Sequence, residues 1–407
     1  MLCTHACASS MTEDPSSRGG VMIMPRVYVA GVGMTKIDRH YDKGILDLAA
    51  EAAFRAIDDA GIKPDAVIVT SMLASKLQEQ DNLGAYVAAG LGLRYRPALH
   101  VEAACGSGGA GVYTGFALIR SGLVDSVLVV GVEKMTDYPT AIVTAGLAQA
   151  ADAEYELYYG ATFTGLNALM MRYYMEKYGV TRDEMSEWPV MMHENALSNP
   201  YAQIRRRITR EDVARSQVIA DPIRLLDSSP IGDGAAAVLL VSEDAAKRLP
   251  EKPIVEIAGA GLAVDTVELS NREILDGMPA ARKAAEQAYR MAGVEPSKID
   301  VMEIHDAFTI NAILLLEELG FAEKGRAAKL VAEGRFHPGD RPTANPSGGL
   351  KARGHPVGAT GVYQVAEVTM QLRGDFPGVK VDGAEVGLAV NVGGDGSTVS
   401  ALVLRRA

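Results

Sequence analysis

Short apolar runs alternate with helix-like patterns along most of this chain. The apolar runs have the length of strands, are bounded by glycine or polar residues, and cover residues 26–33, 66–70, 98–103 and 125–131. Between the first two, residues 44–60 place apolar side chains at helical spacing and end at Gly61, a residue type that is common just after a helix. Near-continuous apolar runs are typical of strands buried in parallel sheets. The pattern therefore predicts an α/β fold.

Two landmarks of the first half recur in the second half in the same order. Ala30–Gly33 has the form Ala-Gly-X-Gly and returns as Ala258–Gly261. Ala60–Pro64 follows an alanine-rich helical pattern and returns as Ala292–Pro296 after another such pattern. A duplicated unit of alternating strands and helices implies two parallel sheets, each covered by helices on both faces. We predict a shared core layered α/β/α/β/α.

Residues 137–225 break this alternation. The segment is rich in Met, Tyr and charged residues, and it predicts helices around 162–178 and 181–198. We interpret it as a loop domain inserted into an N-terminal half, residues 25–250. A C-terminal half, residues 251–407, then follows.

The first 24 residues differ in composition from the rest of the chain. Residues 1–24 are small and polar and show no periodicity, which predicts a disordered tail or an overextended start with a later methionine as the initiator. Cys3, His5 and Cys7 place three ligand-type side chains within five residues of this tail. Such close spacing gives poor tetrahedral geometry, so we expect no metal site.

Composition and charge argue against some classes of binding partner. The 407 residues are 48% hydrophobic and 22% charged, with a net charge of −11, which argues against nucleic acid or an anionic membrane as the main partner. A polyanionic ligand would therefore have to meet a local basic patch. Three cysteines cannot form a disulfide framework, and the chain shows neither a secretory leader pattern nor an 18-residue apolar span. We expect a cytoplasmic protein.

Cys105 lies in the glycine-rich stretch Glu102–Gly115, between an apolar run and a helix-like pattern. The free N–H groups and the dipole at a helix N-terminus favour a thiolate there. Gly106, Gly108 and Gly109 would leave the sulfur open to a substrate. A nucleophile and a small buried core cysteine are both compatible with this stretch alone.

A second glycine-rich turn, residues 354–365, bears His355 at the matching position. Cys105 stands six residues before a Gly-Val-Tyr triplet, and so does His355. If the two halves pack about a pseudo-twofold axis, the thiol and the imidazole meet at their interface. A cysteine beside a histidine is the arrangement that activates a thiol for acyl transfer. The pair therefore favours a nucleophilic Cys105.

Two further stretches are candidates for the same site. An apolar strand pattern ends in His305-Asp306, and the carboxyl ends of parallel strands commonly form the ligand crevice, although a structural histidine is the alternative. Asn391–Gly396 is a glycine-rich turn after a buried strand, and its N–H groups could form part of an oxyanion hole. The glycines form no complete dinucleotide fingerprint, so we expect no dinucleotide site.

Together these motifs resemble the thiolase superfamily. The matching residues are ACGSG around Cys105, GHPVGATG from Gly354, HDAF from His305 and the glycine-rich turn after Asn391. The resemblance extends from Arg26 to Arg406 and includes the loop domain. Within the superfamily the chain is similar to the sterol-carrier-protein-type thiolases, and especially to the acetyl-CoA acetyltransferase branch known from archaea.

The resemblance implies a function and a role for each catalytic residue. It implies condensation of two acetyl-CoA to acetoacetyl-CoA, with coenzyme A thioesters as substrates and no tightly bound cofactor. Cys105 matches the cysteine that carries the acyl group, and His355 matches the histidine that activates it. His305 matches a second histidine in the oxyanion hole for the incoming acyl-CoA. The N–H groups of Cys105 and Gly393 match the donors to the oxygen of the acyl-enzyme.

The resemblance also implies residues that bind coenzyme A. Ser229 matches a serine near the pantetheine arm. Arg205, Arg206 and Arg207 fall where the loop domain meets the phosphates of the coenzyme, which is a looser match.

One departure from the family pattern concerns the second acid/base. Ordinary thiolases carry a second catalytic cysteine where this chain has Asn391, and sterol-carrier-type thiolases carry it where this chain has Ala307. A different group must therefore move the α-proton during condensation. His305 is our first candidate and His355 our second.

The resemblance implies partners and leaves two alternative functions. It implies a homodimer or tetramer, and in the archaeal branch a complex with 3-hydroxy-3-methylglutaryl-CoA synthase and a small zinc-ribbon/OB-fold protein. One alternative is a thiolase-like carbon–carbon lyase of the retro-aldol type, which would have no need of Cys105. The other is a non-catalytic subunit of an acyl-CoA complex, which would have no need of the nucleophile and both histidines.

Overall fold

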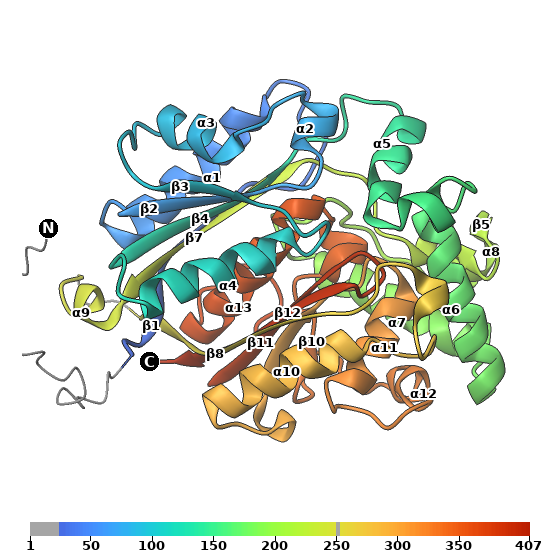
Figure 1. The fold of residues 1–407 in the computed structure, drawn as a ribbon. Helices are drawn as coiled ribbons and strands as arrows, with labels where there is room; N and C mark the ends of the chain where they lie inside the picture. Colours follow the sequence, from blue (N-terminus) through green and yellow to red (C-terminus); the bar gives the residue numbers. More distant parts are fainter. Residues whose placement is uncertain (1–23, 250–252) are drawn as a thin grey trace, which may run out of the picture.

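The computed structural model describes residues 24–249 and 253–407 (Figure 1). Apart from Met24, the tail predicted over residues 1–24 lies outside the described residues, and so do Cys3, His5 and Cys7. The division into two halves with an inserted loop domain stays a prediction.

Within the described residues, ten strands form one sheet in the order β10-β9-β11-β12-β8-β1-β7-β4-β2-β3. The first half contributes β3-β2-β4-β7-β1 and the second half contributes β10-β9-β11-β12-β8, so the two halves share one topology. Two residue pairs between β1 and β8, Tyr28–Glu256 and Val29–Val255, join them. The strands are β1 Val27–Met34, β2 Ala66–Thr70, β3 Ala98–Val101, β4 Ser126–Glu133, β7 Gly234–Ser242, β8 Val255–Val264, β9 Val301–Ile304, β10 Thr343–Ala344, β11 Val386–Gly393 and β12 Thr398–Arg406.

The prediction that both sheets are parallel is wrong in part, because each half is mixed. β2 pairs in parallel with β3 and β4, but β7 runs antiparallel to both β4 and β1. In the second half, β9 is parallel to β10 and β11, whereas β12 is antiparallel to β11 and β8. The reason is clearest at β11 and β12, which only residues 394–397 connect. A connection that short can form a hairpin but cannot cross back over the sheet.

The helices make the predicted layers. Figure 1 shows α4 and α13 between the two halves of the sheet, α1 and α3 over the first half, and α10 to α12 under the second. Three hydrophobic clusters fill the spaces between these layers. The layered α/β/α/β/α prediction is therefore confirmed. These helices are α1 Ile45–Ala60, α2 Ala74–Leu77, α3 Leu83–Gly90, α4 Ser107–Arg120, α9 Glu243–Ala246, α10 Pro279–Ala292, α11 Thr309–Glu318, α12 Ala327–Ala332 and α13 Thr360–Arg373.

The repeated Ala-Gly-X-Gly landmark has the same packing role in both halves. On β1, a side chain at Gly31 would overlap the carbonyl oxygen of Ala56 in α1. On β8, a side chain at Gly259 would overlap the carbonyl oxygen of Ala288 in α10. Glycine in these strands therefore lets each outer helix lie directly on the strand backbone. The duplication seen in the sequence is a duplication of this contact.

The segment 137–225 forms a helical region at one side of the molecule (Figure 1). Its two long helices, α6 and α7, agree with the predicted helices to within two residues at each end. Trp188 of α7 is fully buried and joins the core of the second half. The elements are α5 Thr140–Leu147, α6 Phe163–Tyr178, α7 Arg182–Ala196, α8 Arg210–Arg215, and a small sheet of β5 Val218–Ala220 and β6 Ile223–Arg224.

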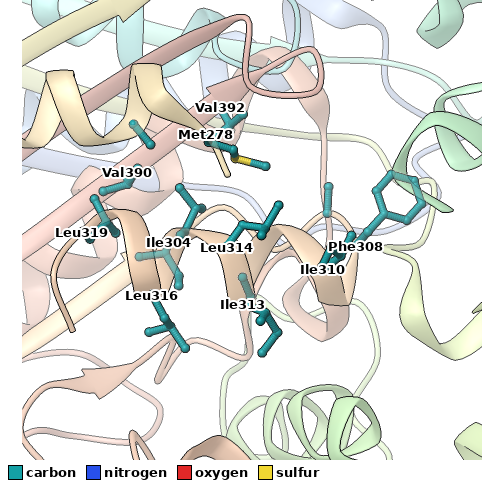
Figure 2. Close-up of a cluster of buried hydrophobic side chains, with 14 of the residues drawn as sticks. Met278, Ile304, Phe308, Ile310, Ile313, Leu314, Leu316, Leu319, Val390 and Val392 are labelled. Carbon is teal, nitrogen blue, oxygen red and sulfur yellow. The ribbon is translucent and has the colours of Figure 1, made fainter. Parts of the chain in front are cut away.

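Helix α11 is buried on all sides, which fixes the turn before it. Every residue of Thr309–Glu318 is buried. Figure 2 shows its side chains, among them Ile313 and Leu316, together with Ile304 at the end of β9 and Val390 of β11. The segment between β9 and α11 contains His305 and Asp306, so this cluster fixes the backbone from which both side chains start.

We expect Gly259→Ala to destabilise the protein by about 2–3 kcal/mol, because the added methyl group would overlap a helix backbone that cannot move independently. Gly44→Ala is the matched control, since the nearest atom to its new methyl group would be Asp47 Oδ2 at 3.5 Å. It should change the free energy of unfolding by less than about 1 kcal/mol. Urea denaturation measures both. Equal stability of the two variants would contradict the packing role of Gly259.

Candidate active site

Cys105 lies in a strained turn between β3 and α4. Ala104, just before it, has a φ of 52°, a left-handed conformation that is uncommon for a residue other than glycine. The Ser107 hydroxyl accepts from the Ala103 N–H at 2.8 Å and donates to the Ala104 carbonyl at 2.6 Å. The Glu102 carboxylate accepts from the Ala104 N–H at 2.6 Å. These bonds hold the turn that presents the Cys105 side chain.

The surroundings of Cys105 favour the thiol over the thiolate. The side chain is 5% exposed and packs in a hydrophobic cluster with Met135, Val143 and Val357. Burial, and then the carboxylates of Glu133 and Asp395, raise the pKa of the Cys105 thiol to about 12. Desolvation therefore opposes the stabilisation of a thiolate that the helix N-terminus is expected to provide. The resting Cys105 needs a base to become a nucleophile.

Cys105 and His355 line one cavity of about 650 Å³. The structure thus brings together the two side chains that the matching turns of the two halves provide. Helix α5 supplies one wall with residues spaced along one face, and the start of α11 supplies another. The wall residues include Thr140, Thr144, Leu147, Ala307 and Phe308.

His355 presents an unprotonated nitrogen. Its Nδ1 lies 2.7 Å from the hydroxyl oxygen of Thr360, and that hydroxyl donates to the Pro356 carbonyl at 3.0 Å. Since the single hydroxyl proton goes to Pro356, the Nδ1–H of His355 donates to Thr360. The neutral ring then carries a lone pair at Nε2 and can accept the thiol proton.

His305 has the opposite tautomer. The Val392 N–H donates to its Nδ1 at 3.3 Å, so the proton of the neutral ring is on Nε2. The rings of His305 and His355 lie edge to face with their centroids 5.0 Å apart. One histidine is therefore an acceptor at Nε2 and its neighbour is a donor at Nε2.

Buried Arg353 helps to keep both histidines neutral. Its Nε lies 3.1 Å from Glu367, and its guanidinium stacks over the Tyr363 ring at 4.9 Å. Burial and then the Arg353 charge lower the pKa of His305 to about 3. Burial, the neighbouring His305 and Arg353 hold the pKa of His355 well below its ordinary value. Neutral rings can act as a base and as an N–H donor at physiological pH.

The loop before His355 is fastened to β9 by carboxylates. Glu303 accepts from the Ser347 N–H at 3.1 Å and from its hydroxyl at 2.7 Å. Asp306 accepts from the Leu350 N–H at 2.7 Å and from the indole N–H of Trp188 at 2.9 Å. Asp306 therefore contacts both the loop and helix α7, and the two histidine segments are fixed to each other.

The predicted oxyanion donors come from adjacent backbones. A Cβ on Gly106 would stand 2.8 Å from the Gly393 nitrogen, so the end of β11 lies against the Cys105 turn. Asn391 lies in β11, within the strand rather than in the predicted turn, and accepts from the Gly109 N–H of α4 at 3.0 Å through Oδ1. The two glycine-rich turns thus form one unit with Cys105.

Of the four residues predicted to bind coenzyme A, one lines the cavity, two line a separate surface hollow and one lines neither space. Ser229 lines the cavity, and its N–H donates to the Ala307 carbonyl at 2.8 Å. Arg206 and Arg207 line a separate surface hollow of about 430 Å³ that shares Leu225 with the cavity. Arg207 forms a two-bond ion pair with Glu194 at 2.8 and 2.9 Å. Arg205 donates to the Leu197 carbonyl at 3.0 Å and lines neither space.

Several residues of the site were missed at the level of sequence. Thr360 lies within the GHPVGATG motif, and Arg353 lies directly before it. Their short separation from His355 in the sequence could have suggested that they support this histidine. The cavity-lining residues of α5 could not be recognised in the sequence, because the chain directly after residue 137 shows no strong periodicity. Arg215 joins Arg206 at the surface hollow, although it is remote from the arginine triplet in sequence.

The described residues also bear on metals and membranes. Among residues 24–249 and 253–407, no three His, Cys, Asp or Glu side chains gather in a way that could hold a metal ion. In the same part of the chain, no helix has the length and apolar character needed to cross a membrane.

Thr360→Val should reduce the rate of Cys105 alkylation by iodoacetamide at pH 7 by about 10-fold, because His355 would lose the acceptor that fixes its tautomer. Thr369→Val is the matched control: Thr369 is buried on the same helix and donates to the Val365 carbonyl at 2.7 Å. Mass spectrometry of the Cys105 peptide follows the reaction. A similar loss of rate in both variants would mean that Thr360 acts only on stability.

Comparisons with known proteins agree with this geometry. The family model of the thiolase N-terminal domain matches residues 27–244, and that of the thiolase C-terminal domain matches residues 261–406. The chain is 43% identical to an acetyl-CoA acetyltransferase of Methanothermobacter thermautotrophicus, over 94% of this chain and 100% of the relative. It is 33% identical to chicken (Gallus gallus) sterol carrier protein 2, over 95% of this chain and 73% of the relative.

A solved structure described as an Ltp2-ChsH2(DUF35) aldolase superposes with a TM-score of 0.82 at 26% identity, over 94% of this chain and 99% of that one. The family models cover both halves of the fold, the duplicated turns bring Cys105 and His355 to one cavity, and His305 packs against His355. The chain belongs to the thiolase family.

Proposed function

We propose that this protein is an acetyl-CoA acetyltransferase that condenses two acetyl-CoA to acetoacetyl-CoA through a thioester on Cys105. The observation that carries the proposal is that Cys105 and His355, a histidine whose Nε2 is unprotonated, line one cavity. The 43% identity to an archaeal acetyl-CoA acetyltransferase supports the choice of acyl group. The reaction is reversible, because the Cys105 thioester can be attacked either by the second acetyl-CoA or by the thiol of coenzyme A.

In the first half-reaction, His355 Nε2 takes the Cys105 proton while the sulfur attacks the thioester carbonyl. The oxygen that becomes negative is stabilised by the N–H groups of Cys105 and Gly393, each worth roughly 3–4 kcal/mol in comparable sites. The bond from the carbonyl carbon to the sulfur of coenzyme A then breaks. The departing thiolate takes the proton from His355, which returns to its neutral state.

In the second half-reaction, a second acetyl-CoA loses a methyl proton and attacks the Cys105 thioester. The enolate oxygen that forms needs a donor, and the Nε2–H of His305 supplies one. Because the ring is neutral and buried, it can stabilise the enolate without transferring its own proton. Cys105 is released as the carbon–carbon bond forms.

Coenzyme A would extend from the cavity toward the arginine-lined hollow. Ser229 lies on the cavity lining, within reach of a pantetheine arm. Leu225 lines both spaces, so a ligand passing over it would bring its phosphates to Arg206 and Arg215. A local basic hollow is what an acidic chain needs to bind a polyanionic coenzyme.

Exposed features support an oligomer and further partners. Strand β3 ends the sheet order, and its Leu99 is 50% exposed, which suits pairing with a second copy in a homodimer or tetramer. The likeness to a structure described with a DUF35 component supports a complex with a small zinc-ribbon/OB-fold protein. A complex with 3-hydroxy-3-methylglutaryl-CoA synthase rests on the resemblance to the archaeal branch.

The lyase alternative has one observation in its favour, which is the TM-score of 0.82 to an aldolase structure. A retro-aldol reaction breaks a carbon–carbon bond without an acyl-thioester, so it does not require a cysteine activated by a base. Cys105 and His355 are both retained and face one cavity, which favours acyl transfer. The same retention argues against a non-catalytic subunit.

Acetyl-CoA should leave an acetyl group, about 42 Da by the covalent-intermediate logic, on Cys105 of the purified protein. Intact mass and peptide mapping after an acid quench measure it. Cys105→Ala is the control and should show no adduct. An adduct on another cysteine, or its absence from the wild-type protein under conditions that preserve thioesters, would rule out the proposed intermediate.

Arg206→Ala should raise KM for acetyl-CoA about 5-fold, since one exposed charge contact contributes up to about 1 kcal/mol. KM for acetyl-pantetheine, which has no adenosine phosphates, should not change. Arg248→Ala, an exposed arginine near α9, serves as the control. Equal effects on both substrates would show that Arg206 does not contact the phosphates.

A further inference from the structure

Ala307 and Asn391 stand at the two positions where the resemblance to the thiolase superfamily implies a second catalytic cysteine. Ala307 lines the cavity but has no proton to exchange. Asn391 has an amide, which neither gains nor loses a proton at physiological pH. The proton on the second acetyl-CoA must therefore be moved by another group in the site.

Asn391 has a fixed orientation. Its Oδ1 accepts from the Gly109 N–H at 3.0 Å, and a backbone N–H can only donate, so the oxygen and nitrogen of the amide are assigned. Its Nδ2 then faces His305 Nδ1 at 3.2 Å. The amide donates to the ring.

His305 is consequently held as a donor. Its Nδ1 accepts from two N–H groups, the Asn391 amide at 3.2 Å and the Val392 backbone at 3.3 Å. A proton on Nδ1 would meet two other protons and leave two buried donors unsatisfied. The nearby Arg353 charge opposes a second proton on the ring. With Nε2 protonated and Nδ1 occupied, His305 has no free lone pair for a substrate proton.

The nearby carboxylates already accept other hydrogen bonds or form an ion pair, so none of them is available as the base. Glu133 accepts from Ser71 and from three backbone N–H groups, those of Met72, Leu73 and Gly358. Asp38 lines the cavity but pairs with Lys36 at 2.5 Å and is 43% exposed at its side chain. Asp395 accepts from the Asn167 amide at 2.6 Å.

We infer that His355 Nε2 moves the proton in both half-reactions, and that Asn391 is a positioning residue that holds His305 as a fixed hydrogen-bond donor. This inference rests on the proposed function. It reverses the order of the two candidates that the sequence suggested. A single base replaces the usual division of labour between a histidine and a second cysteine.

The steps balance with one base. In acylation the proton leaves Cys105 for His355 and departs with coenzyme A. In condensation a methyl proton of the second acetyl-CoA moves to His355, and the enolate carbon bonds to the thioester carbonyl. The bond from the carbonyl carbon of the thioester to the Cys105 sulfur breaks, and the proton returns from His355 to the sulfur. The site ends as it began, with a neutral histidine and a thiol.

The test separates proton removal from acyl transfer. In Cys105→Ala, which cannot be acylated, the methyl protons of acetyl-CoA should still exchange with deuterium oxide, as followed by mass spectrometry. Adding His355→Gln should slow the exchange by about 100-fold or more, the usual contribution of a general base. Adding His305→Gln instead keeps an N–H donor but no base, and should slow it by less than about 10-fold.

Three outcomes would overturn the inference. They are a 100-fold loss in His305→Gln, retention of exchange in His355→Gln, and no exchange in Cys105→Ala while the wild-type protein condenses acetyl-CoA. If His355→Gln does not fold, Thr360→Val replaces it and should slow exchange about 10-fold, with Thr369→Val unchanged. Failure of the proposed function would appear separately, as a wild-type protein that neither acetylates Cys105 nor forms acetoacetyl-CoA.

The role of Asn391 has its own readout. Nitrogen-15 NMR of labelled histidine should show His305 protonated at Nε2 and His355 at Nδ1 in the wild-type protein. Asn391→Asp replaces the amide donor with an acceptor and should move a proton onto His305 Nδ1. Asn391→Leu, which removes the donor without adding an acceptor, should leave Nδ1 unprotonated because Val392 still donates. An unchanged His305 spectrum in Asn391→Asp would overturn the positioning role.

Discussion

The active site depends on the direct contact of two helix backbones at the centre of the molecule. Helices α4 and α13 meet at Gly108 and Gly361, where a Cβ on Gly108 would stand 2.6 Å from the Gly361 nitrogen. Real side chains cannot approach so closely, so only glycine permits this contact. Each helix begins a few residues after one catalytic side chain, Cys105 on one and His355 on the other. The closeness of the helices therefore sets the closeness of the thiol and the imidazole.

Burying this contact places the chemistry in a region without bulk water, and the consequences for charge follow. Cys105 becomes a weaker acid and the histidines become weaker bases, because each charged form loses its hydration. A neutral cysteine beside a neutral histidine is stable at rest. In the proposed mechanism it becomes reactive only when an oxyanion forms, which the N–H groups of Cys105 and Gly393 would stabilise. Arg353, which pairs with Glu367, adds a fixed positive charge, and this charge keeps the two histidine rings unprotonated.

The duplication and the candidate catalytic side chains could be predicted from the sequence, because both depend on residues with few substitutes. Gly31 and Gly259 are visible in the sequence since close backbone packing excludes every other residue. Cys105 and His355 could be matched since they stand at the same offset in the two turns. The strand directions, the tautomers and the α5 wall could not be read, because they depend on connections, hydrogen-bond partners and contacts between distant segments. Asn391 illustrates the limit: the sequence shows a missing cysteine, and only the structure shows what the amide holds.

Replacing a cysteine by an asparagine at this place changes how protons can move through the site. A thiol could act as a second base, so the two half-reactions could use different groups. An amide cannot, but it can fix a neighbouring ring as a permanent donor, which stabilises the enolate without exchanging protons. One base suffices only if it is neutral at the start of each half-reaction. Release of coenzyme A as a thiol meets that condition, because the leaving group carries away the proton that His355 took from Cys105.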